Sequence, residues 1–407
     1  MSKKVLGMIM AGGKGTRLYP LTRDRAKPAV PFGGKYRIID FVLSNFINSG
    51  IYAVYVMTQF KSQSLAEHLQ DGWRLSGLLR DHFIIPVPAQ MRTGESWYKG
   101  TSDAIYQNLH LIERFKPDIV AIFGADHIYR IDIRQMIDYH VTTNSEVTVS
   151  AVPYPVEKCE GMGIIEIDKK WQIIGFEEKP KVPKPIPSMP ELALVSMGNY
   201  LFNTDVLMKV LEEDAVRETA HDFGKTILPD IYKKRKVFAY NFKTNVIPGI
   251  QSGEEAGYWR DIGTIEAYWE AHMDLKNIRP VFNLYNPKWP LRTVSYSNPP
   301  AKFVHAEEGR TGTAINSLIS EGTIVSGAKV LGSIIGRNAR IHSYSEIKDS
   351  IIMDNVDIGE GAKITRSIID KNVMIPPGAV IGEGAATLEN SFICRDSGIV
   401  VVPKKAR

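Results

Sequence analysis

Residues 318–381 read LISEGTIVSGAKVLGSIIGRNARIHSYSEIKDSIIMDNVDIGEGAKITRSIIDKNVMIPPGAVI, and apolar side chains recur through them at a fixed interval. Successive apolar positions are six, six and five residues apart, and this triplet repeats until the series ends. Three columns with a period of 17 residues result: Leu318, Ile335, Ile352 and Ile369; Ile324, Ile341, Ile358 and Ile375; Val330, Ile347, Ile364 and Ile381.

The period predicts a triangular solenoid, in which each side of a coil contributes one inward apolar residue and four coils stack. Gly336, Gly359 and Gly382 lie near the predicted corners, where a residue without a Cβ tolerates sharp backbone turns. An antiparallel β-sandwich is the alternative. A sandwich would alternate with period two between irregular loops, and it would not keep a 17-residue interval.

The chain before the repeat has another pattern, because apolar runs alternate with longer mixed segments from Met1 to about Asn277. The runs at 5–11, 51–58 and 118–125 are bounded by glycine, proline or charge, which is typical of strands with two buried faces. Helical patterns cover 102–115, 134–142 and 264–275, and a hairpin is expected around Lys169-Lys170. The alternation predicts an α/β domain with a mostly parallel sheet.

Length and composition agree with this division. The 407 residues allow two or three domains, and we expect one over 1–277, a proline-punctuated connection over 278–311 and the solenoid over 312–407. Two distant cysteines cannot form a disulfide framework, which favours a reducing, cytoplasmic setting. No run of about 18 apolar residues predicts a membrane span. The net charge of +5 fits anionic partners.

A glycine-rich loop, AGGKGTRL at 11–18, follows the first predicted strand. Its glycines let backbone N–H groups approach a phosphate or a base, and Lys14 and Arg17 add positive charge. The loop matches neither GxxxxGK[ST] nor GxGxxG, and a lone loop of this kind can also be a tight turn.

Asp126 ends the apolar run at 118–125, and Asp261 precedes the helical pattern that starts at 264. An acid at the carboxyl end of a buried parallel strand lies where ligands bind in open α/β sheets, although either residue could be a helix cap or turn residue. Two converging carboxylates would suit Mg²⁺, but sequence spacing does not show that they converge. We interpret His127 as structural, because the histidines lack metal-ligand spacing. No GxSxG, HExxH or Cys/His cluster supports a hydrolase or a zinc site.

Eight segments in order carry a family resemblance: AGGKGTRL, LTRDRAKPAVPFGGKYRIIDFVLSN, WYKGTSDAIYQN, FGADHIY, FEEKP, SMGNYLF, HDFGK and YWRDIGT. Along essentially its whole length the chain resembles the bacterial glucose-1-phosphate adenylyltransferases (ADP-glucose pyrophosphorylases), which are sugar nucleotidyltransferases. The first segment is common to sugar nucleotidyltransferases, whereas the second and HDFGK favour the adenylyl enzymes. The resemblance implies a Rossmann-like nucleotidyltransferase catalytic domain at 1–277 and a left-handed β-helix of hexapeptide-type repeats at 312–407.

The resemblance also implies a reaction, in which ATP and α-D-glucose 1-phosphate give ADP-glucose and pyrophosphate for glycogen biosynthesis. The implied residues are Gly12, Gly13, Gln90 and Gly100 for the nucleotide, Arg17 and Lys27 for the triphosphate, Asp126 and Asp261 for Mg²⁺, and Glu178, Lys179, Ser196, Tyr98 and Gly163 for glucose 1-phosphate. The attacking phosphate oxygen is ionised at neutral pH, so no general base is needed. Positioning and cations should reduce the charge repulsion instead.

Regulation by small anionic metabolites and assembly as a homotetramer are further implications of the resemblance. Arg25, Arg37 and Arg366 are the candidate anion ligands. Asp24 and Pro31 stand where enterobacterial members carry basic residues, so the resemblance does not name the activator. The chain lacks the N-terminal cysteine of the plant small subunits, and we expect no redox switch of that kind.

Three other functions stay open at this point. The nearest is a nucleotidyltransferase for another nucleoside triphosphate or sugar phosphate. A non-catalytic regulatory subunit would be favoured by the loss of Arg17, Lys27, Asp126 or Asp261, but all four are present. Nucleic-acid binding has less support, because acids are interspersed with the basic residues and no known nucleic-acid motif occurs.

Overall fold

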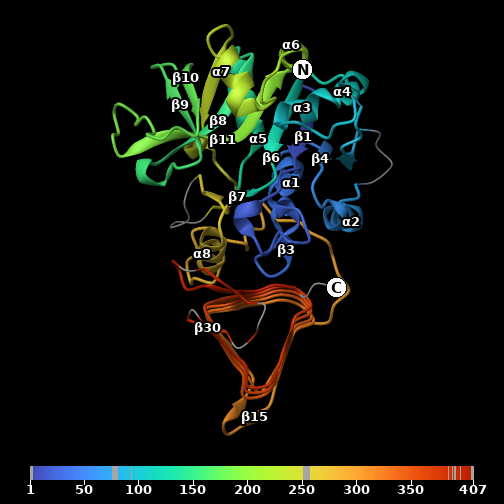
Figure 1. The fold of residues 1–407 in the computed structure, drawn as a ribbon, viewed down its shortest axis with the longest axis vertical. Helices are drawn as coiled ribbons and strands as arrows, with labels where there is room; N and C mark the ends of the chain where they lie inside the picture. Colours follow the sequence, from blue (N-terminus) through green and yellow to red (C-terminus); the bar gives the residue numbers. More distant parts are fainter. Residues whose placement is uncertain are drawn as a thin grey trace.

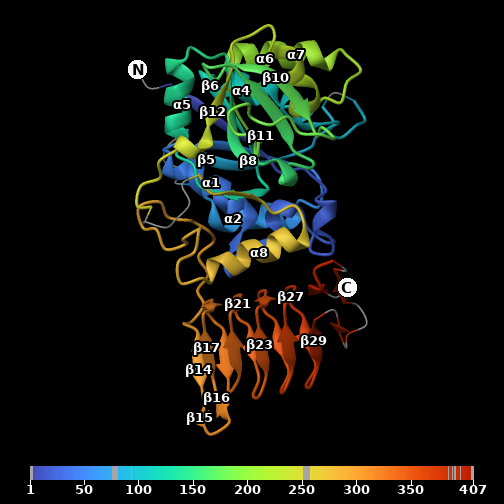
Figure 2. The same ribbon diagram turned by 90° about the vertical axis from the view of Figure 1, so that its left-hand side faces the viewer.

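The α/β domain rests on one side of a triangular prism of short strands, and helix α8 (Ile265–Leu275) runs between the two parts (Figures 1 and 2). This computed structural model describes residues 3–404 except 76–80, 93, 251–256, 384, 387, 389–390 and 395. Among the residues it describes, no helix is both long enough and apolar enough to cross a membrane.

The central sheet of the α/β domain has nine strands in the order β10-β9-β11-β6-β1-β4-β5, with β8 paired to β11 and β12 paired to β8. Pairing is parallel from β6 through β1 and β4 to β5, which confirms the predicted mostly parallel core. The strands are β1 (Val5–Met10), β4 (Ala53–Thr58), β5 (Phe83–Pro88), β6 (Ile119–Gly124), β8 (Val147–Pro155), β9 (Gly163–Ile167), β10 (Ile173–Glu178), β11 (Leu192–Asn203) and β12 (Val237–Asn241). The antiparallel pair β9 and β10 is the predicted hairpin.

Helices cover both faces of this sheet, because side chains alternate between two cores along each strand. Leu6 and Met8 of β1 belong to one core, whereas Ile9 belongs to the other. The first core also receives side chains of α3, α4, α6 and α7, and the second those of α1, α2 and α5. The helices are α1 (Ile38–Asn48), α2 (Gln63–Gly72), α3 (Thr101–Tyr106), α4 (Leu109–Phe115), α5 (Ile133–Thr142), α6 (Thr204–Ala215) and α7 (Leu228–Ile231).

The helix predicted at 102–115 is two helices, α3 and α4, with a break at Asn108. The Asn108 side chain donates to the carbonyl oxygen of Ala104 at 2.8 Å, and its backbone N–H donates to Ile105 instead. The Asn108 side chain thus donates to the carbonyl oxygen that a helical backbone N–H would otherwise bind. Asparagine side chains often compete in this way with backbone hydrogen bonds.

The prism consists of three sheets in the orders β14-β19-β22-β25-β28, β17-β20-β23-β26-β29-β30 and β18-β21-β24-β27-β32-β31. Parallel pairing between successive coils confirms the predicted solenoid. Its strands are β14 (Lys302–Val304), β17 (Thr313–Ile315), β18 (Leu318–Ile319), β19 (Ile324–Ser326), β20 (Lys329–Leu331), β21 (Ile334–Ile335), β22 (Arg340–Ile341), β23 (Glu346–Lys348), β24 (Ile351–Ile352), β25 (Asp357–Ile358), β26 (Lys363–Thr365), β27 (Ser367–Ile369), β28 (Met374–Ile375), β29 (Val380–Gly382), β30 (Ala385–Ala386), β31 (Phe392–Ile393) and β32 (Val400–Val402), with a hairpin of β15 (Ala306–Glu307) and β16 (Arg310–Thr311).

The predicted register is wrong by one residue in the first coil. Ile319 pairs with Ile335, and Val325 pairs with Ile341, so Leu318 and Ile324 do not occupy the inner columns. Ile319 and Val325 each follow another aliphatic residue, and a pattern of apolar residues cannot choose between two adjacent aliphatic positions. The third column, from Val330 to Ile381, has the predicted register.

The three corner glycines allow the coils to pass close to one another. A Cβ on Gly336 would lie 2.7 Å from the carbonyl carbon of Met353, and one on Gly359 would lie 2.5 Å from the nitrogen of Pro377. Gly382 also has a φ of +134°, a conformation that favours glycine. Close approach of the next coil therefore requires glycine at all three corners, and positive φ requires it at one.

A ladder of apolar side chains on the outer face of the prism joins the prism to the α/β domain. Ile334, Ile351 and Ile368 stand on the outer face of the sheet that carries Ile335, Ile352 and Ile369 inward, and they pack with Tyr268 of α8 and Phe282. Consecutive residues of a strand face opposite sides, so each isoleucine pair serves two cores. The ladder gives the two parts a continuous apolar contact.

The connection between the two parts contains structure of its own. Strand β14 falls within 278–311 and pairs with β19 of the prism. Residues 289–294 return to the α/β domain, where the Thr293 hydroxyl donates to Asp40 of α1 at 2.7 Å. The domain limits at 277 and 312 stay a prediction.

Candidate active site

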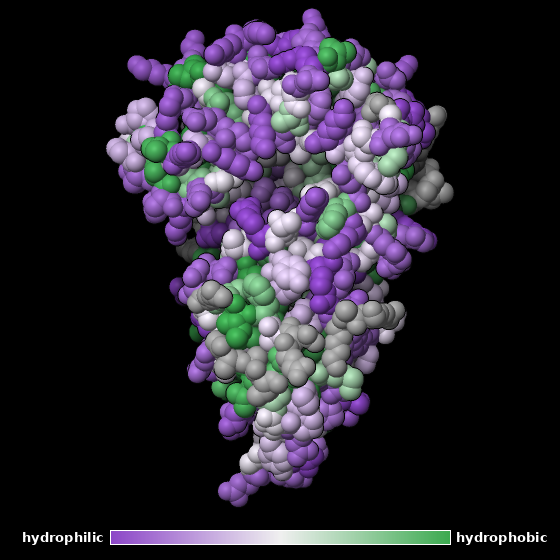
Figure 3. Space-filling model, viewed as in Figure 1, coloured by the Kyte–Doolittle hydropathy of each residue, from purple (hydrophilic) through white to green (hydrophobic). Residues whose placement is uncertain are grey.

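A cleft of about 510 Å³ opens at the carboxyl edge of β1, β4 and β6, where it appears as a hollow in the α/β domain (Figure 3). This is the edge at which open α/β sheets bind ligands. The cleft gathers twelve of the thirteen residues predicted for nucleotide, sugar phosphate or metal: Gly12, Gly13, Arg17, Lys27, Tyr98, Gly100, Asp126, Gly163, Glu178, Lys179, Ser196 and Asp261.

Gln90 is the exception. It is exposed just after β5 and does not line the described part of the cleft. A different amide, that of Gln59 directly after β4, lines the cleft and accepts a hydrogen bond from the backbone N–H of Tyr98 at 3.1 Å. The sequence analysis missed Gln59, although its place at the end of a buried parallel strand was a usable signal.

The glycine-rich loop lines the floor of the cleft. The Ala11 N–H donates to the Met57 carbonyl of β4 at 2.9 Å, which fixes the start of the loop on the sheet. Gly15 has a φ of +61°, and a Cβ there would lie 2.9 Å from the Cβ of Lys27. Around Gly13 the cleft is open, since no atom of the described chain lies within 4 Å of its Cβ position. Glycine thus leaves room both for Lys27 and for a ligand.

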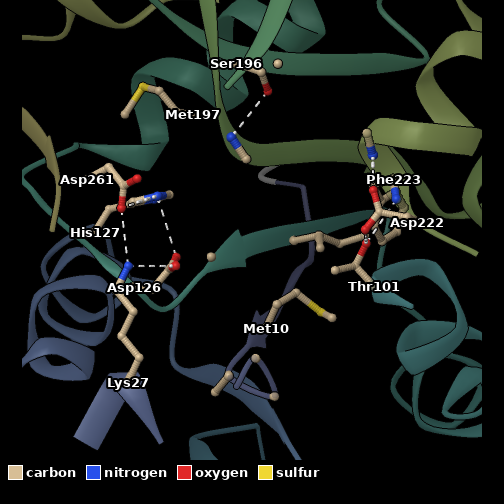
Figure 4. Close-up of a pocket in the computed structure, with 18 of the residues that line it drawn as sticks. Met10, Lys27, Thr101, Asp126, His127, Ser196, Met197, Asp222, Phe223 and Asp261 are labelled. Carbon is tan, nitrogen blue, oxygen red and sulfur yellow. Dashed lines mark hydrogen bonds and ion pairs between the residues drawn. The ribbon is translucent and has the colours of Figure 1, made fainter. Parts of the chain in front are cut away.

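Two carboxylates converge on Lys27 (Figure 4). The Lys27 ammonium nitrogen lies 3.1 Å from Asp126 Oδ2 and 3.2 Å from Asp261 Oδ1. Asp126 follows β6, whereas Asp261 ends β13 (Trp259–Asp261), which pairs antiparallel with β7 (His127–Tyr129) and sets Asp261 opposite His127. This pairing brings together two acids that are 135 positions apart, by the difference of their residue numbers.

The charges of this group stabilise one another. Burial by itself would raise the pKa of Asp126, but the nearby Lys27 ammonium outweighs it and holds that pKa well below its usual range. Burial likewise opposes the charge of Lys27, yet Asp126 and Asp261 raise its pKa above the ordinary lysine value. Lys27 and Asp126 are therefore both charged at neutral pH.

The donor set at this point fits a divalent cation. Ligand atoms of Asp126, His127 and Asp261 all lie within 4.8 Å of one another. His127 Nε2 is 3.6 Å from Asp126 Oδ1 and 3.9 Å from Asp261 Oδ1, so the residue that we interpreted as structural belongs to the group. Carboxylate oxygens are the ligands that Mg²⁺ and Mn²⁺ prefer, and imidazole binds several divalent metals.

The opposite wall of the cleft carries Glu178, Lys179 and Ser196 from the hairpin and β11. Lys179 lines this wall, has a φ of +55° and donates its N–H to the Met162 carbonyl at 3.0 Å. Burial raises the pKa of Glu178. A Cβ on Gly163 or Gly224 would come within 2.8 or 2.6 Å of Glu178 Oε2, and both glycines therefore make room for that carboxylate.

Comparisons with known proteins agree with this geometry. Residues 6–278 match the family described as Nucleotidyl transferase, and residues 299–402 match the one described as GlmU-like, C-terminal hexapeptide. The chain is 55% identical to a glucose-1-phosphate adenylyltransferase of Thermus thermophilus over 351 residues, which is 85% of this chain and 84% of the relative. Its identity is 51% to the enzyme of that name from an Anaeromyxobacter species and 48% to the one from Deinococcus radiodurans, each over 99% of both chains.

The chain belongs to the glucose-1-phosphate adenylyltransferase family. The hexapeptide match also identifies the prism as the expected left-handed β-helix. Nucleotidyl transferases generally use a divalent metal, and the carboxylate pair of the cleft has the chemistry to hold one.

Three more residues of this adenylyltransferase cleft escaped the sequence analysis, although they lie inside quoted motifs. Asp222 of HDFGK accepts hydrogen bonds from Gly224 N–H at 2.9 Å and from the Thr101 hydroxyl at 2.9 Å, which ties the π-helical turn η4 (Phe223–Ile227) to the start of α3 (Figure 4). Phe223 and Trp259 also line the cleft.

Gly100 cannot be replaced easily, because a Cβ there would overlap the carbonyl oxygen of His221.

The three candidate effector arginines lie outside the cleft and do not form one group. Arg25 is buried against Asp370 of the β-helix at 2.6 Å, and Arg37 donates to the Ser64 carbonyl oxygen at 2.5 Å. Burial, together with the positive charge of Arg37, lowers the pKa of nearby Lys371 to about 8. Arg366 instead stacks on the Trp269 ring at 4.4 Å and donates to the Ser397 carbonyl. Lys371 is thus the cation that accompanies Arg25 and Arg37, and sequence spacing gave no sign of it.

Proposed function

We propose that the protein transfers the adenylyl group of ATP to α-D-glucose 1-phosphate, which gives ADP-glucose and pyrophosphate. The observation that carries the proposal is the pairing of Lys27 with two converging carboxylates at the mouth of the glycine-rich loop. Phosphoryl and nucleotidyl transfer need cations and positioning, and this cleft supplies both. The relatives named glucose-1-phosphate adenylyltransferase support the choice of ATP and glucose 1-phosphate.

The nucleotide would enter over the glycine-rich loop. Gly12 and Gly13 would let the backbone approach it, and Gly100 would contact it where α3 begins. Arg17 and Lys27 would bind the triphosphate and then the departing pyrophosphate, since both line the same side of the cleft. Gln90 stays a predicted adenine contact that the described geometry does not support, and Gln59 is the amide within reach.

Asp126 and Asp261 would hold Mg²⁺. Mg²⁺ prefers oxygen ligands, and here these would be the two carboxylates and the phosphates of the nucleotide. When bound, the ion neutralises phosphate charge and polarises the α-phosphoryl group. His127 lies beside the two carboxylates, with its Nε2 3.6 Å from Asp126 and 3.9 Å from Asp261.

Glucose 1-phosphate would bind along the opposite wall. Lys179 would contact its phosphate, and Glu178 and Ser196, with Tyr98 and Gly163 nearby, would contact the sugar. A phosphate oxygen then attacks the α-phosphorus of ATP, the bond to the β-phosphate breaks, and pyrophosphate leaves. The attacking oxygen is already anionic, so these side chains need only bind and orient the two substrates.

Pyrophosphate release tests this proposal. We expect release with ATP and glucose 1-phosphate to exceed release with UTP, dTTP or GTP, and other sugar phosphates to be poor replacements. Faster release with another nucleotide would assign the chain to a different nucleotidyltransferase. Absence of release with every triphosphate would favour the non-catalytic regulatory subunit, a reading that the four converging residues Arg17, Lys27, Asp126 and Asp261 oppose.

We further infer a setting in glycogen biosynthesis, a homotetramer, a cytoplasmic location and regulation by small anions. The cluster of Arg25, Arg37 and Lys371 beside the β-helix supports an anion effector, because the positive charges of Arg37 and Arg25 add to the effect of burial in lowering the pKa of Lys371. Activity measured with fructose 6-phosphate, fructose 1,6-bisphosphate, pyruvate, AMP, ADP and phosphate would identify the effectors. Arg25→Gln should then abolish the response, whereas no response to any of them in the parent protein would remove this part of the proposal.

A further inference from the structure

Among the cations that line the described cleft, Lys27 is the one whose charged group contacts both Asp126 and Asp261. Its side chain is 7% exposed, and it contacts both acids within 3.2 Å. Arg17 is 64% exposed and approaches only Asp261, at 3.7 Å. The ammonium of Lys27 therefore offsets part of the negative charge of the two carboxylates in the protein without substrates.

The oxygens that hold this ammonium are also those that a metal ion needs. Asp126 Oδ2 and Asp261 Oδ1 both accept hydrogen bonds from Lys27, and both belong to the group of ligand atoms within 4.8 Å. A divalent ion binds such oxygens at about 2.0–2.6 Å and would lie next to the ammonium. Two cations at one carboxylate pair repel each other, so the ammonium and the metal cannot both occupy it favourably.

The backbone and the base of the Lys27 side chain are packed, and the residue lines the open cleft. The backbone is held in the short helical turn η2 (Lys27–Ala29), and the Lys27 Cβ packs against Gly15. The remaining stem is flexible, as in any lysine. The open space around Gly13 lies in the same cleft, where the proposed function puts phosphates.

We propose that Lys27 is an internal counterion that excludes divalent metal from Asp126 and Asp261 until a nucleoside triphosphate draws its ammonium away. This inference rests on the proposed function for the nature of the incoming anion. It makes metal and nucleotide bind with positive coupling, and by linkage each strengthens the other equally. The free protein then keeps its carboxylate pair filled without a metal.

Mn²⁺ binding to the full chain without nucleotide, measured by electron paramagnetic resonance and by titration calorimetry, tests the exclusion. Lys27→Met should bind Mn²⁺ at least ~10-fold more tightly than the parent protein, because the ammonium no longer competes. Arg17→Met removes the same charge nearby but leaves Lys27 in place, so its Mn²⁺ affinity should change less than ~3-fold. Asp126→Asn should lose Mn²⁺ binding in both measurements, which would locate the ion at this carboxylate pair.

Equal or weaker Mn²⁺ binding by Lys27→Met would overturn the proposal, as would an equal gain in Arg17→Met. Circular dichroism checks that each variant is folded, and Lys27→Gln, whose neutral amide N–H groups can still donate hydrogen bonds, replaces Lys27→Met if the latter does not fold. ATP without sugar phosphate should raise the Mn²⁺ affinity of the parent protein beyond the binding of Mn²⁺ to ATP itself, and this gain should shrink in Lys27→Met. An undiminished gain would contradict the role of Lys27.

The outcome separates this inference from the proposed function. If the parent protein makes ADP-glucose but Lys27→Met gains no Mn²⁺ affinity, only the counterion role fails. If Lys27→Met gains affinity but the parent protein consumes no triphosphate with glucose 1-phosphate, the exclusion stands and the proposed function fails.

Discussion

The cleft and the β-helix of this chain are stabilised in opposite ways. The β-helix repeats one apolar contact, in which an isoleucine or valine stacks on its counterpart one coil away, as Ile341 does on Ile358. The cleft brings together charged side chains from segments between residues 12 and 261, and several of them are half exposed. Changes in the β-helix should therefore alter stability more than chemistry, and changes in the cleft should do the reverse.

The largest expected effect lies in the cleft. Asp126→Asn should lower kcat by about 10²–10³-fold, the scale for losing one electrostatic contact in an active site. The unfolding free energy should change by about 1 kcal/mol or less, because the carboxylate is partly exposed and Lys27 keeps Asp261. Steady-state kinetics and urea unfolding measure the two quantities on the same sample. Near-normal turnover would remove Asp126 from the chemistry.

The β-helix should show the reverse pattern. Ile352→Ala empties a fully buried position and should lower the unfolding free energy by about 2–5 kcal/mol, with kcat per folded molecule unchanged. Met374→Ala, at a position that is 72% exposed, is the matched control and should stay within about 0.5 kcal/mol. A loss of kcat with normal stability in Ile352→Ala would contradict the division between the two regions.

A smaller effect should separate the two walls of the cleft. Lys179→Ala should raise the KM for glucose 1-phosphate by about 10–100-fold, the range for one hydrogen bond to a charged group. The KM for ATP should stay within about twofold of the parent value, because Lys179 stands on the wall opposite the glycine-rich loop. Initial-rate kinetics with each substrate varied decide this. A rise in the KM for ATP alone would assign Lys179 to the nucleotide.

The smallest effect concerns α8, between the two regions. Burial lowers the pKa of His272 to about 3, so the folded protein keeps this side chain neutral where the unfolded chain, with a pKa near 6.5, takes up a proton. Stability must fall as the pH drops below 6.5, by about 1 kcal/mol at pH 5.5 from this group. His272→Gln should lose that part of the acid sensitivity in urea unfolding at pH 7 and 5.5. An unchanged pH dependence in His272→Gln would show that other groups cause it.

The sequence predicts the two regions unequally well, for a physical reason. Each β-helix contact joins residues about 17 positions apart, so a local pattern reveals it, and the only ambiguity is between neighbours such as Leu318 and Ile319. In the cleft, Asp126 could be found from its place at the end of β6. Its convergence with Asp261 depends on the pairing of β7 with β13, and this pairing produces no periodic pattern in the sequence. That Gln59 lines the described cleft and Gln90 does not has the same origin, because only the fold decides which strand end faces the cleft.

In the proposed reaction, a phosphate oxygen of glucose 1-phosphate attacks the α-phosphorus of ATP in this cleft. Glucose 1-phosphate in which every phosphate oxygen is labelled with ¹⁸O, followed by mass spectrometry of the products, tests this step. We expect ADP-glucose that keeps the whole label and pyrophosphate that carries none. Labelled pyrophosphate, or the absence of ADP-glucose, would contradict it.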